Sequence, residues 1–449
     1  MATLFVAADR SAAGPGRPNV IFILADDLGY GDLGCYGQTR IHTPVIDRLG
    51  AQGIRFTNAY AGCTVCAPSR CTLLTGLHTG HCWVRGNRIT TLDGQPTIAS
   101  MLKSAGYTTG VIGKWGMSMP DEPGPPGRQG FDYFFGYMTH VDAHNYYPEF
   151  LWENDQQVRL PGNVVVKGVA TERTTYAPDV VTSKALNFLE ANRAHPFFLY
   201  LAFILPHANN EAGKVDGRGM EVPSDAPYSR EDWPQAQKNH AAMITRLDSD
   251  VGKVLAKLDE LGIADNTLVF FSSDNGPHKE GGADPEFFDS AGPLSGYKRS
   301  MTEGGIRVPM LVRWPTTIKP GQTSDLPWAF WDVMPTLADV CGAQAPEKID
   351  GISIAPTLVG PERADGPQRK HEYLYWEFHE RGFHQAIRFG PWKAIRDGLD
   401  GRIALYDLSS DLAEEHDLSA EQTEIVAEAK KLLGSARTDS ELFPVTETK

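Results

Sequence analysis

The chain has 449 residues, with 42 Lys or Arg against 56 Asp or Glu, so its formal net charge at pH 7 is −14. This surplus of acidic side chains disfavours a polyanionic partner such as nucleic acid. Hydrophobic residues make up 41% of the chain and charged residues 22%, which is a globular composition and excludes wholesale disorder. The apolar runs are shorter than the ~18 residues that a membrane-spanning helix needs, so we expect no membrane span.

Residues 1–17 are predicted to be an N-terminal extension. Residues 1–8 (MATLFVAA) are apolar and resemble the end of a secretory signal whose basic start is missing. We therefore expect a periplasmic or secreted protein. Four of the six cysteines lie between positions 63 and 82. Such clustering indicates local chemistry more than a disulfide framework, which a chain of this length does not need.

Short apolar runs alternate with helical patterns through most of the chain. The runs are 19–25, 108–113, 196–203 and 266–272. The predicted helices are 43–52, 70–77, 97–105, 178–192 and 239–261. Continuous apolar strands alternating with helices are typical of a sheet covered on both faces. We therefore expect an α/β domain over residues 18–362, with a large, mainly parallel mixed sheet sandwiched by helices.

The pattern changes after residue 370. Short alternating segments follow at 372–377, 385–388, 392–396 and 404–408, and a helix is predicted at 421–433. Turn signals between these segments favour an antiparallel meander. We expect a smaller C-terminal domain of antiparallel sheet plus helix over residues 363–449, with the boundary in the stretch 360–368.

Polar side chains follow each of the four apolar runs. In an open parallel sheet, ligands bind beyond the carboxyl ends of the strands, so these positions are candidate site residues. They are Asp26 and Asp27 after the first run, Lys114 after the second, His207 after the third, and Asp274 and Asn275 after the fourth. The carboxylates and the amide form an all-oxygen set, which suits Ca²⁺ or Mg²⁺ better than zinc. Carboxylates gathered without a cation would repel one another, so we expect a metal site here.

Residues 66–70 (CAPSR) are the most specific chemical signal in the chain. Proline is tolerated in the first turn of a helix, so Pro68 and the residues after it place Cys66 at a helix N-terminus. Exposed N–H groups and the helix dipole favour negative charge there, as a nucleophile requires. Cys63 and Cys66 alone also fit a redox pair or half of a zinc site. The sequence has no second ligand pair at zinc spacing, and the oxygen-rich set fits neither alternative.

The segment from Cys66 to Arg70, followed by Thr75 and Gly76, resembles the signature of the type I sulfatases of the alkaline-phosphatase superfamily. In that family the cysteine is converted to formylglycine. The resemblance is closest to the carbohydrate sulfatases and extends over most of the chain. Further segments match the family in order: 19–30 (NVIFILADDLGY), 113–116 (GKWG), 130–136 (GFDYFFG), 205–207 (LPH), 273–276 (SDNG), Lys298 and 303–309 (EGGIRVP).

The resemblance implies a metal site and a modified nucleophile. Calcium, or magnesium, would be held by formylglycine formed from Cys66 together with Asp26, Asp27, Asp274 and Asn275. A formylglycine-generating maturation enzyme would be a required partner. In the implied reaction, one hydroxyl of the formylglycine hydrate attacks the sulfur of a sulfate ester, and the second hydroxyl then expels sulfate as the aldehyde re-forms.

Four further residues belong to the site by the same resemblance. Arg70 and Lys114 would orient and stabilise the formylglycine hydrate. His207 and Lys298 would bind the sulfate, and His207 is also a candidate general acid toward the leaving oxygen. These roles agree with the chemistry, because sulfuryl transfer needs cationic groups around the sulfate oxygens and a metal that lowers the pKa of the attacking hydroxyl.

Position 116 departs from the family pattern. Many relatives have a histidine there, the usual base for sulfate release, whereas this chain has Gly116. His278 is a candidate substitute, and a structural or substrate-facing role for it also stays open. We expect His144, His278, His379 and Glu380 to face the substrate. The segments around His144, His379 and Glu380 resemble pocket walls of carbohydrate sulfatases and suit a sugar ring.

The leading hypothesis is an exo-acting sulfatase that removes sulfate from a carbohydrate, for example a galactose-type unit of a sulfated glycan. Two alternatives remain open. A phosphodiesterase or phosphonate monoester hydrolase of the same superfamily would use the same metal and cations. A glycan-binding pseudoenzyme, indicated by Gly116, would bind a sulfated sugar without turnover even after residue 66 is converted.

Overall fold

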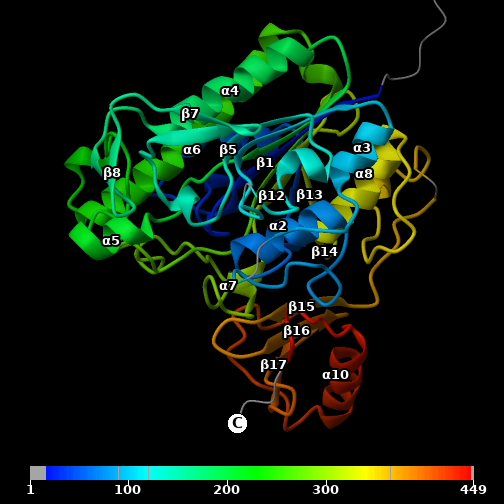
Figure 1. Cartoon of the computed structure of the whole chain (residues 1–449). Coiled ribbons are helices and arrows are strands. Elements are labelled where there is room, and N and C mark those ends of the chain that lie inside the picture. The colour runs from blue at the N-terminus through cyan, green and yellow to red at the C-terminus, as the bar shows by residue number, and fades with distance from the viewer. Residues whose placement is uncertain (1–16, 89–90, 120, 365, 446–449) are drawn as a thin grey trace, which may run out of the picture.

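The computed structural model describes residues 17–88, 91–119, 121–364 and 366–445, and its main element is a ten-stranded mixed sheet (Figure 1). In spatial order the strands are β13 (Gln322–Ser324), β2 (Ile54–Phe56), β12 (Met310–Arg313), β11 (Thr267–Ser273), β1 (Asn19–Ala25), β10 (Phe197–Ala202), β4 (Thr108–Lys114), β5 (Tyr133–Tyr137), β6 (Phe150–Glu153) and β7 (Gln156–Arg159). The five strands from β11 to β5 run parallel. Antiparallel pairings join β12 and β6 to this centre.

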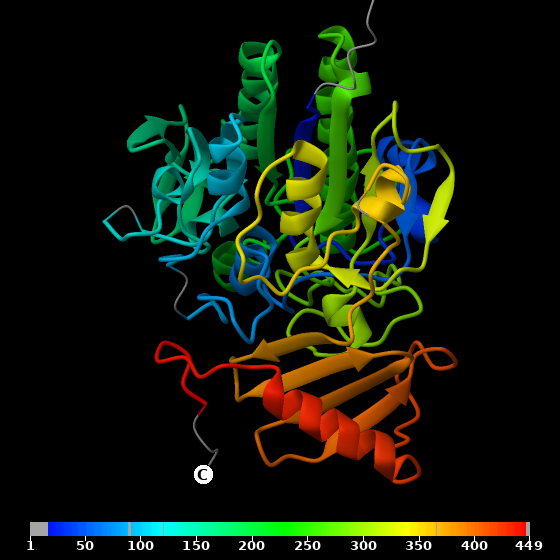
Figure 2. The same ribbon diagram turned by 90° about the vertical axis from the view of Figure 1, so that its right-hand side faces the viewer.

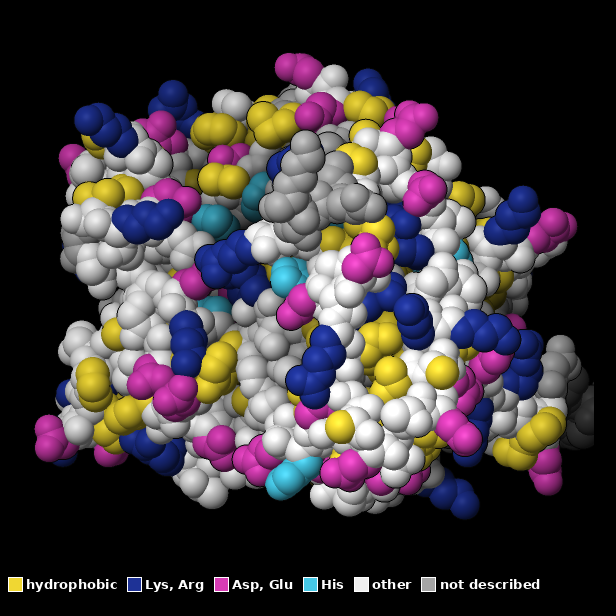
Figure 3. Space-filling view, turned by 90° about the horizontal axis from the view of Figure 1, so that it is seen from below, with side chains coloured by type: hydrophobic (Ala, Val, Ile, Leu, Met, Phe, Trp, Pro, Cys, Tyr) yellow, Lys and Arg dark blue, Asp and Glu magenta, His cyan; other side chains and the backbone are white. Residues whose placement is uncertain are grey.

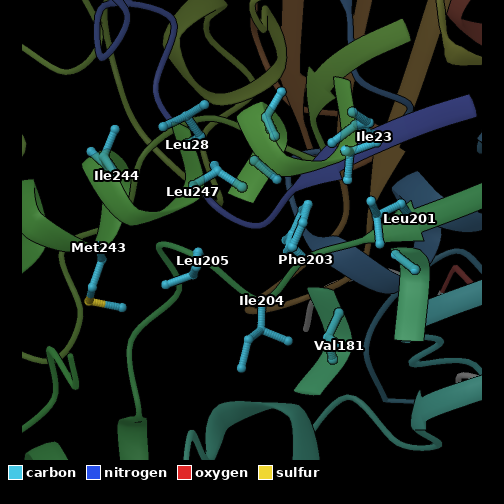
Figure 4. Close-up of a cluster of buried hydrophobic side chains, with 14 of the residues drawn as sticks. Ile23, Leu28, Val181, Leu201, Phe203, Ile204, Leu205, Met243, Ile244 and Leu247 are labelled. Atoms are coloured by element: carbon cyan, nitrogen blue, oxygen red, sulfur yellow. The ribbon is translucent and has the colours of Figure 1, made fainter. Parts of the chain in front are cut away.

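Helices cover both faces of the sheet (Figures 1 and 2). One layer contains α1 (Pro44–Ala51), α4 (Ala177–Asn192) and α6 (Gln235–Glu260), and the other contains α2 (Cys66–Thr75), α3 (Ile98–Ser104) and α8 (Val333–Cys341). Side chains of β1 alternate between the layers, with Ile21 and Ile23 in the first core and Phe22 and Leu24 in the second. Figure 4 shows part of the first core. Because both faces are covered, every residue of β1 is buried, and its sequence is continuously apolar after Asn19.

A second, four-stranded antiparallel sheet lies below the first (Figures 1 and 2). It contains β15 (Leu374–Phe378), β16 (His384–Phe389), β17 (Trp392–Asp397) and β18 (Ile403–Asp407), and α10 (Thr423–Ser435) follows. One face packs against Ala429 and Leu433 of α10. On the other face, Trp376 belongs to a buried cluster with Tyr60 and Trp331 of the larger part. The small sheet is therefore held between its own helix and the rest of the molecule.

Shorter elements complete the fold. They are α5 (Asn210–Asp216), α7 (Glu303–Ile306), α9 (Ala355–Val359), the ladder of β3 (Ala59–Tyr60) with β14 (Trp328–Ala329), and the ladder of β8 (Val164–Val166) with β9 (Val169–Glu172). Within the described ranges, no helix combines the length and the apolar character that crossing a membrane requires.

The predicted fold class is confirmed, and the four apolar runs form β1, β4, β10 and β11. The helix predicted at 70–77 is wrong at both ends, whereas the prediction that Cys66 lies at a helix N-terminus is confirmed. The helix begins at Cys66, because a first turn does not need the N–H that Pro68 lacks, and it ends at Thr75, because Gly76 takes a left-handed φ of 71°. The helix predicted at 239 already begins at Gln235. Residues 1–16 of the predicted extension lie outside the described residues. The domain boundary predicted in the stretch 360–368 stays a prediction.

Core packing around Phe22 tests this architecture. The side chain is 1% exposed and lies between the rings of Tyr200, Phe270 and Phe330. Phe22→Ala is expected to lower the free energy of unfolding by about 3–5 kcal/mol, because it removes apolar contacts and leaves a cavity. Denaturant unfolding measures the change. Val215→Ala, at a side chain that is 71% exposed, is the control, and its free energy of unfolding should change by no more than about 0.5 kcal/mol. Equal denaturation midpoints for the two variants would contradict the assignment of Phe22 to the core.

Candidate active site

The candidate site lies where four central strands end. β11, β1, β10 and β4 are adjacent and parallel, so their carboxyl ends meet at one edge of the sheet. This edge brings together the polar residues that follow the four apolar runs. Lys114 Nζ lies 2.6 Å from Asp26 Oδ2, and His207 Nε2 lies 3.4 Å from Asp27 Oδ2.

Asp26, Asp27, Asp274 and Asn275 form a fully buried, oxygen-rich cluster. The backbone N–H of Asp27 donates to Asp274 Oδ1 at 3.1 Å, and Asn275 Nδ2 donates to Asp27 Oδ1 at 2.7 Å. Asp27 has a φ of 65°, which is uncommon outside glycine. Asp26 Oδ1 and Asn275 Oδ1 are buried and have no hydrogen-bond partner among the described residues. Two open acceptors beside further carboxylates fit a hard divalent cation.

Burial and mutual repulsion separate the pKa values of these carboxyl groups. Burial raises the pKa of Asp274 to about 7, and the charge of Asp26 adds to the rise. Burial acts on Asp26 in the same direction, but the charges of Lys114 and other neighbouring cations lower its pKa to about 2. Burial also raises the pKa of Asp27, but the charges of Lys298 and His278, together with hydrogen bonds from Lys298 and Asn275, outweigh it and lower the pKa. The cluster therefore concentrates negative charge in a buried place, which favours cation binding.

Basic side chains that are at most 3% exposed face the carboxylates. Arg70 of α2 donates from Nε and Nη2 to Asp274 Oδ2 at 3.0 and 2.8 Å, and from Nη1 to the carbonyl oxygen of Lys114 at 2.9 Å. Lys298 Nζ lies 2.8 Å from Asp27 Oδ2. These pairings hold Arg70, Lys114 and Lys298 around one point, where an anionic group can be bound.

Cys66 is the first residue of α2 and is 2% exposed. Burial raises the pKa of its thiol, so the unmodified side chain is not an activated nucleophile at neutral pH. Its Sγ lies 3.7 Å from Asn87 Oδ1. Cys63 instead contacts the carbonyl oxygen of Glu377 at 3.7 Å. All six cysteines are free, and the groups of described residues that could hold a metal contain no cysteine; neither the redox pair nor the zinc alternative gains support.

His207 is a neutral imidazole in this arrangement. Its Nδ1 lies 2.6 Å from the carbonyl oxygen of Ala208 and therefore carries the hydrogen, so Nε2 accepts from Lys298 Nζ at 3.1 Å. Burial lowers the pKa of His207 well below its ordinary value, and the charge of Lys298 adds to this. The predicted general-acid role and a hydrogen bond from Nε2 to a sulfate oxygen both require a hydrogen on Nε2, so both require His207 to gain a proton when an anion is bound beside it.

Two predicted substrate-facing residues, His144 and His278, flank His207. The His144 ring stacks on it at 4.7 Å between centroids, and His144 Nδ1 lies 3.0 Å from Glu211 Oε2. The His278 ring lies 6.0 Å away. His278 Nε2 is 3.3 Å from a backbone carbonyl oxygen, and Nδ1 accepts from the backbone N–H of Glu280 at 3.0 Å. Both nitrogens of His278 thus contact the backbone, and its role as the base for sulfate release stays a prediction.

The other two predicted substrate-facing residues follow β15 of the small sheet. His379 Nε2 lies 2.9 Å from Oε1 of the buried Glu377. Glu380 Oε2 accepts from Arg299 Nε at 3.0 Å, and Arg299 follows Lys298 directly in the chain. The small sheet is thus connected to the cationic part of the site. On the lower face of the molecule, Figure 3 shows basic and acidic side chains interspersed with histidines.

Sequence reasoning missed three residues of the site, Asn87, His140 and Glu280. Glu280 Oε2 accepts from Lys298 Nζ at 3.2 Å. His140 lies beside Gly116, where a β-carbon would be 3.7 Å from His140 Cβ, and burial lowers the pKa of His140 to about 4. All three residues lie in loops. His140 follows the end of β5 by three residues and Glu280 follows His278 by two, so position along the chain could have indicated these two, whereas no signal in the sequence indicates Asn87.

Comparisons with known proteins identify the family of the chain. Residues 18–343 match the family model described as "Sulfatase", and residues 296–439 match "N-sulphoglucosamine sulphohydrolase, C-terminal". The chain is 31% identical to N-acetylgalactosamine-6-O-sulfatase of Bacteroides thetaiotaomicron over 94% of this chain and 93% of that protein. It is 33% identical to arylsulfatase A of Bos taurus over 87% of this chain and 77% of that protein.

A solved structure is similar over the same extent. The crystal structure of Ps i-CgsB matches with a TM-score of 0.79 at 29% identity, covering 96% of this chain and 95% of that one. The sulfatase family model spans more than half of the chain, and the Bacteroides relative matches over nearly the full length of both proteins. The chain therefore belongs to the sulfatase family and is an enzyme that hydrolyses sulfate esters.

Proposed function

We propose that this sulfatase removes sulfate from the end of a sulfated carbohydrate, with residue 66 as formylglycine and calcium in the carboxylate cluster. The observation that carries the proposal is the buried cluster with two open acceptor oxygens, Asp26 Oδ1 and Asn275 Oδ1, beside three cationic side chains. Uncompensated acceptors of this kind are rare in folded proteins.

The relatives indicate the class of sugar. One is named N-acetylgalactosamine-6-O-sulfatase, and Ps i-CgsB, 29% identical to this chain, has been solved in complex with k-i-k-neocarrahexaose. We infer that a galactose-type sulfated sugar is the substrate of this chain. A periplasmic or secreted location suits such a glycan and is part of the proposal.

The metal would be held by Asp26, Asp27, Asp274, Asn275 and the converted residue 66. Calcium accepts several carboxylate and amide oxygens, whereas magnesium usually keeps several waters, so a five-ligand protein site favours calcium. When bound, the ion supplies positive charge that lowers the pKa of a hydroxyl ligand and stabilises charge on a sulfate oxygen.

The chain's own residues would position the reacting groups. Formylglycine formed from Cys66 by a maturation enzyme supplies a hydrated aldehyde, whose two hydroxyls serve attack on sulfur and release of sulfate. Arg70 and Lys114 would orient that side chain from the sheet edge. Lys298 and His207 would bind the sulfate, His207 after its Nε2 gains a proton, since their nitrogens lie 3.1 Å apart and can reach the same group.

A screen of mono-sulfated sugars tests the function. Sulfate release is expected from at least one galactose-type substrate, with a higher kcat/KM than for the matching phosphate monoester, phosphodiester or phosphonate monoester. A preference for one of the phosphorus esters would favour the hydrolase alternative of the same superfamily. Tight binding of a sulfated sugar without turnover, in protein whose residue 66 is fully converted, would favour the pseudoenzyme.

Replacement of Cys66 tests the nucleophile. Cys66→Ala, and Cys66→Ser produced without a serine-converting maturase, are expected to abolish turnover while leaving the unfolding transition in place, because neither side chain supplies two hydroxyls. Mass spectrometry of the wild-type peptide should show a residue about 18 Da lighter than cysteine. Multiple turnovers by the alanine variant would rule out this nucleophile.

Replacement of Asp274 tests the metal site. Asp274→Ala and Asp274→Asn are expected to lose bound calcium and activity together, because a hard cation loses affinity with each carboxylate removed. Asp274→Asn keeps the volume of the side chain and an oxygen for Arg70, so loss of metal from it does not depend on misfolding. Metal content by elemental analysis is the measurement, with Asp155→Ala at an exposed acidic residue as control. A full equivalent of calcium in both Asp274 variants would show that the site lies elsewhere.

Replacement of His207 separates sulfate binding from proton transfer. We expect His207→Ala to lower kcat/KM by a similar factor for sugar sulfates and for activated aryl sulfates, because both classes carry the sulfate group that His207 would bind. A loss for sugar sulfates that is larger by roughly 10²–10⁴ would instead assign proton donation to His207, because only sugar alcohols need a proton to leave.

A further inference from the structure

The N-terminus of α2 is capped from outside the helix. Val65 occupies the N-cap position and makes no side-chain cap, so the first N–H groups of the helix need other acceptors. Asn87 Oδ1 accepts from the backbone N–H of Ala67 at 3.1 Å. A loop residue that follows the helix therefore does what a Ser, Thr, Asp or Asn at position 65 would otherwise do.

The same oxygen atom contacts the side chain of residue 66. Asn87 Oδ1 lies 3.7 Å from Cys66 Sγ, and an amide oxygen has two lone pairs to share between two donors. One acceptor thus joins the first turn of the helix to the nucleophile position. This contact limits how far the side chain of residue 66 can turn away from the carboxylate cluster.

The loop that carries Asn87 is anchored on the small sheet. Arg85 is 3% exposed, and its Nη1 donates to Glu377 Oε1 of β15 at 2.9 Å and to the carbonyl oxygen of Thr438 at 2.8 Å. Its Nε donates to the carbonyl oxygen of Cys82 at 3.1 Å. Glu377 is itself fully buried, so the ion pair is shielded from solvent. These contacts fix the position of Arg85, two residues before Asn87.

We propose that Asn87 is a positioning residue for the side chain of residue 66, and that the Arg85–Glu377 ion pair holds Asn87 in place. The inference rests on the proposed function, because it concerns residue 66 after conversion. Asn87 Oδ1 would then accept from a hydroxyl of the converted side chain, which is a stronger donor than a thiol. Asn87 exchanges no proton in this role.

The test compares Asn87→Ala, Asn87→Asp and Arg85→Lys with the wild type, per molecule of converted protein. Conversion is counted by mass spectrometry of the residue 66 peptide. Asn87→Ala is expected to lower kcat by roughly 10–100-fold with little change in KM, because misplacement of a reacting group by about 1 Å costs this much. The aldehyde of residue 66 should also react faster with an aminooxy probe, which forms an oxime and releases water, since its hydrate has lost an acceptor.

The other variants separate positioning from helix capping. Asn87→Asp keeps the oxygen that caps α2, so its unfolding temperature and probe-labelling rate should stay at the wild-type values. Arg85→Lys keeps the charge but loses the fixed geometry of the guanidinium, and it should change kcat and labelling in the same direction as Asn87→Ala. Arg88→Ala, at an exposed residue of the same loop, is the matched control and should leave both unchanged.

Two results would overturn the inference. If Asn87→Ala lowers only the unfolding temperature, with kcat and labelling rate per converted molecule at wild-type values, then Asn87 only caps the helix. If Arg85→Lys matches the wild type in both readouts, then the ion pair does not hold Asn87. Failure of the proposed function is visible separately in the wild-type sample, as an unconverted residue 66 or as absence of sulfate release, and would remove the inference with it.

Discussion

The arrangement of the site depends on three carboxylates, Asp26, Asp27 and Asp274, that are buried together at one edge of the central sheet. Like charges in a buried place are unfavourable unless cations match them closely. Arg70 and Lys298 supply part of this compensation from a helix and a loop that are distant in sequence. The parallel strands make the problem unavoidable, because adjacent parallel strands deliver their following residues to the same edge.

The compensation within the protein is incomplete, and this is what makes the edge a site. One oxygen of Asp26 and one of Asn275 remain without a partner among the described residues, and the pKa of Asp274 is raised to about 7 by burial and by its neighbour Asp26. A fully paired cluster would be a structural ion-pair network with no place for a ligand. Here the protein side chains satisfy most of the oxygens and leave two without a partner among the described residues, which the proposed calcium would bind.

The small sheet contributes to the site through β15. Trp376 Nε1 donates to the carbonyl oxygen of Ala61 at 2.9 Å, and the carbonyl oxygen of Glu377 contacts Cys63 Sγ, so β15 supports the segment that leads into α2. Farther along, Glu380 pairs with Arg299 next to the cationic part of the site. The position of residue 66 therefore depends on packing between the two sheets as well as on its own helix.

The sequence by itself determined that helices cover both faces of the central sheet and that the candidate site lies at one edge of it. Continuous apolar runs that alternate with helices favour strands covered on both faces, and the polar residues that follow such strands meet where parallel strands end. Asp26 and Asp274 could therefore be assigned to one edge of the sheet from the sequence alone. Only the tertiary structure decided that Asn87 caps α2 and that burial lowers the pKa of His207. Each of these depends on contacts between loops far apart in the chain or on the degree of burial, and neither quantity is encoded in local spacing or periodicity.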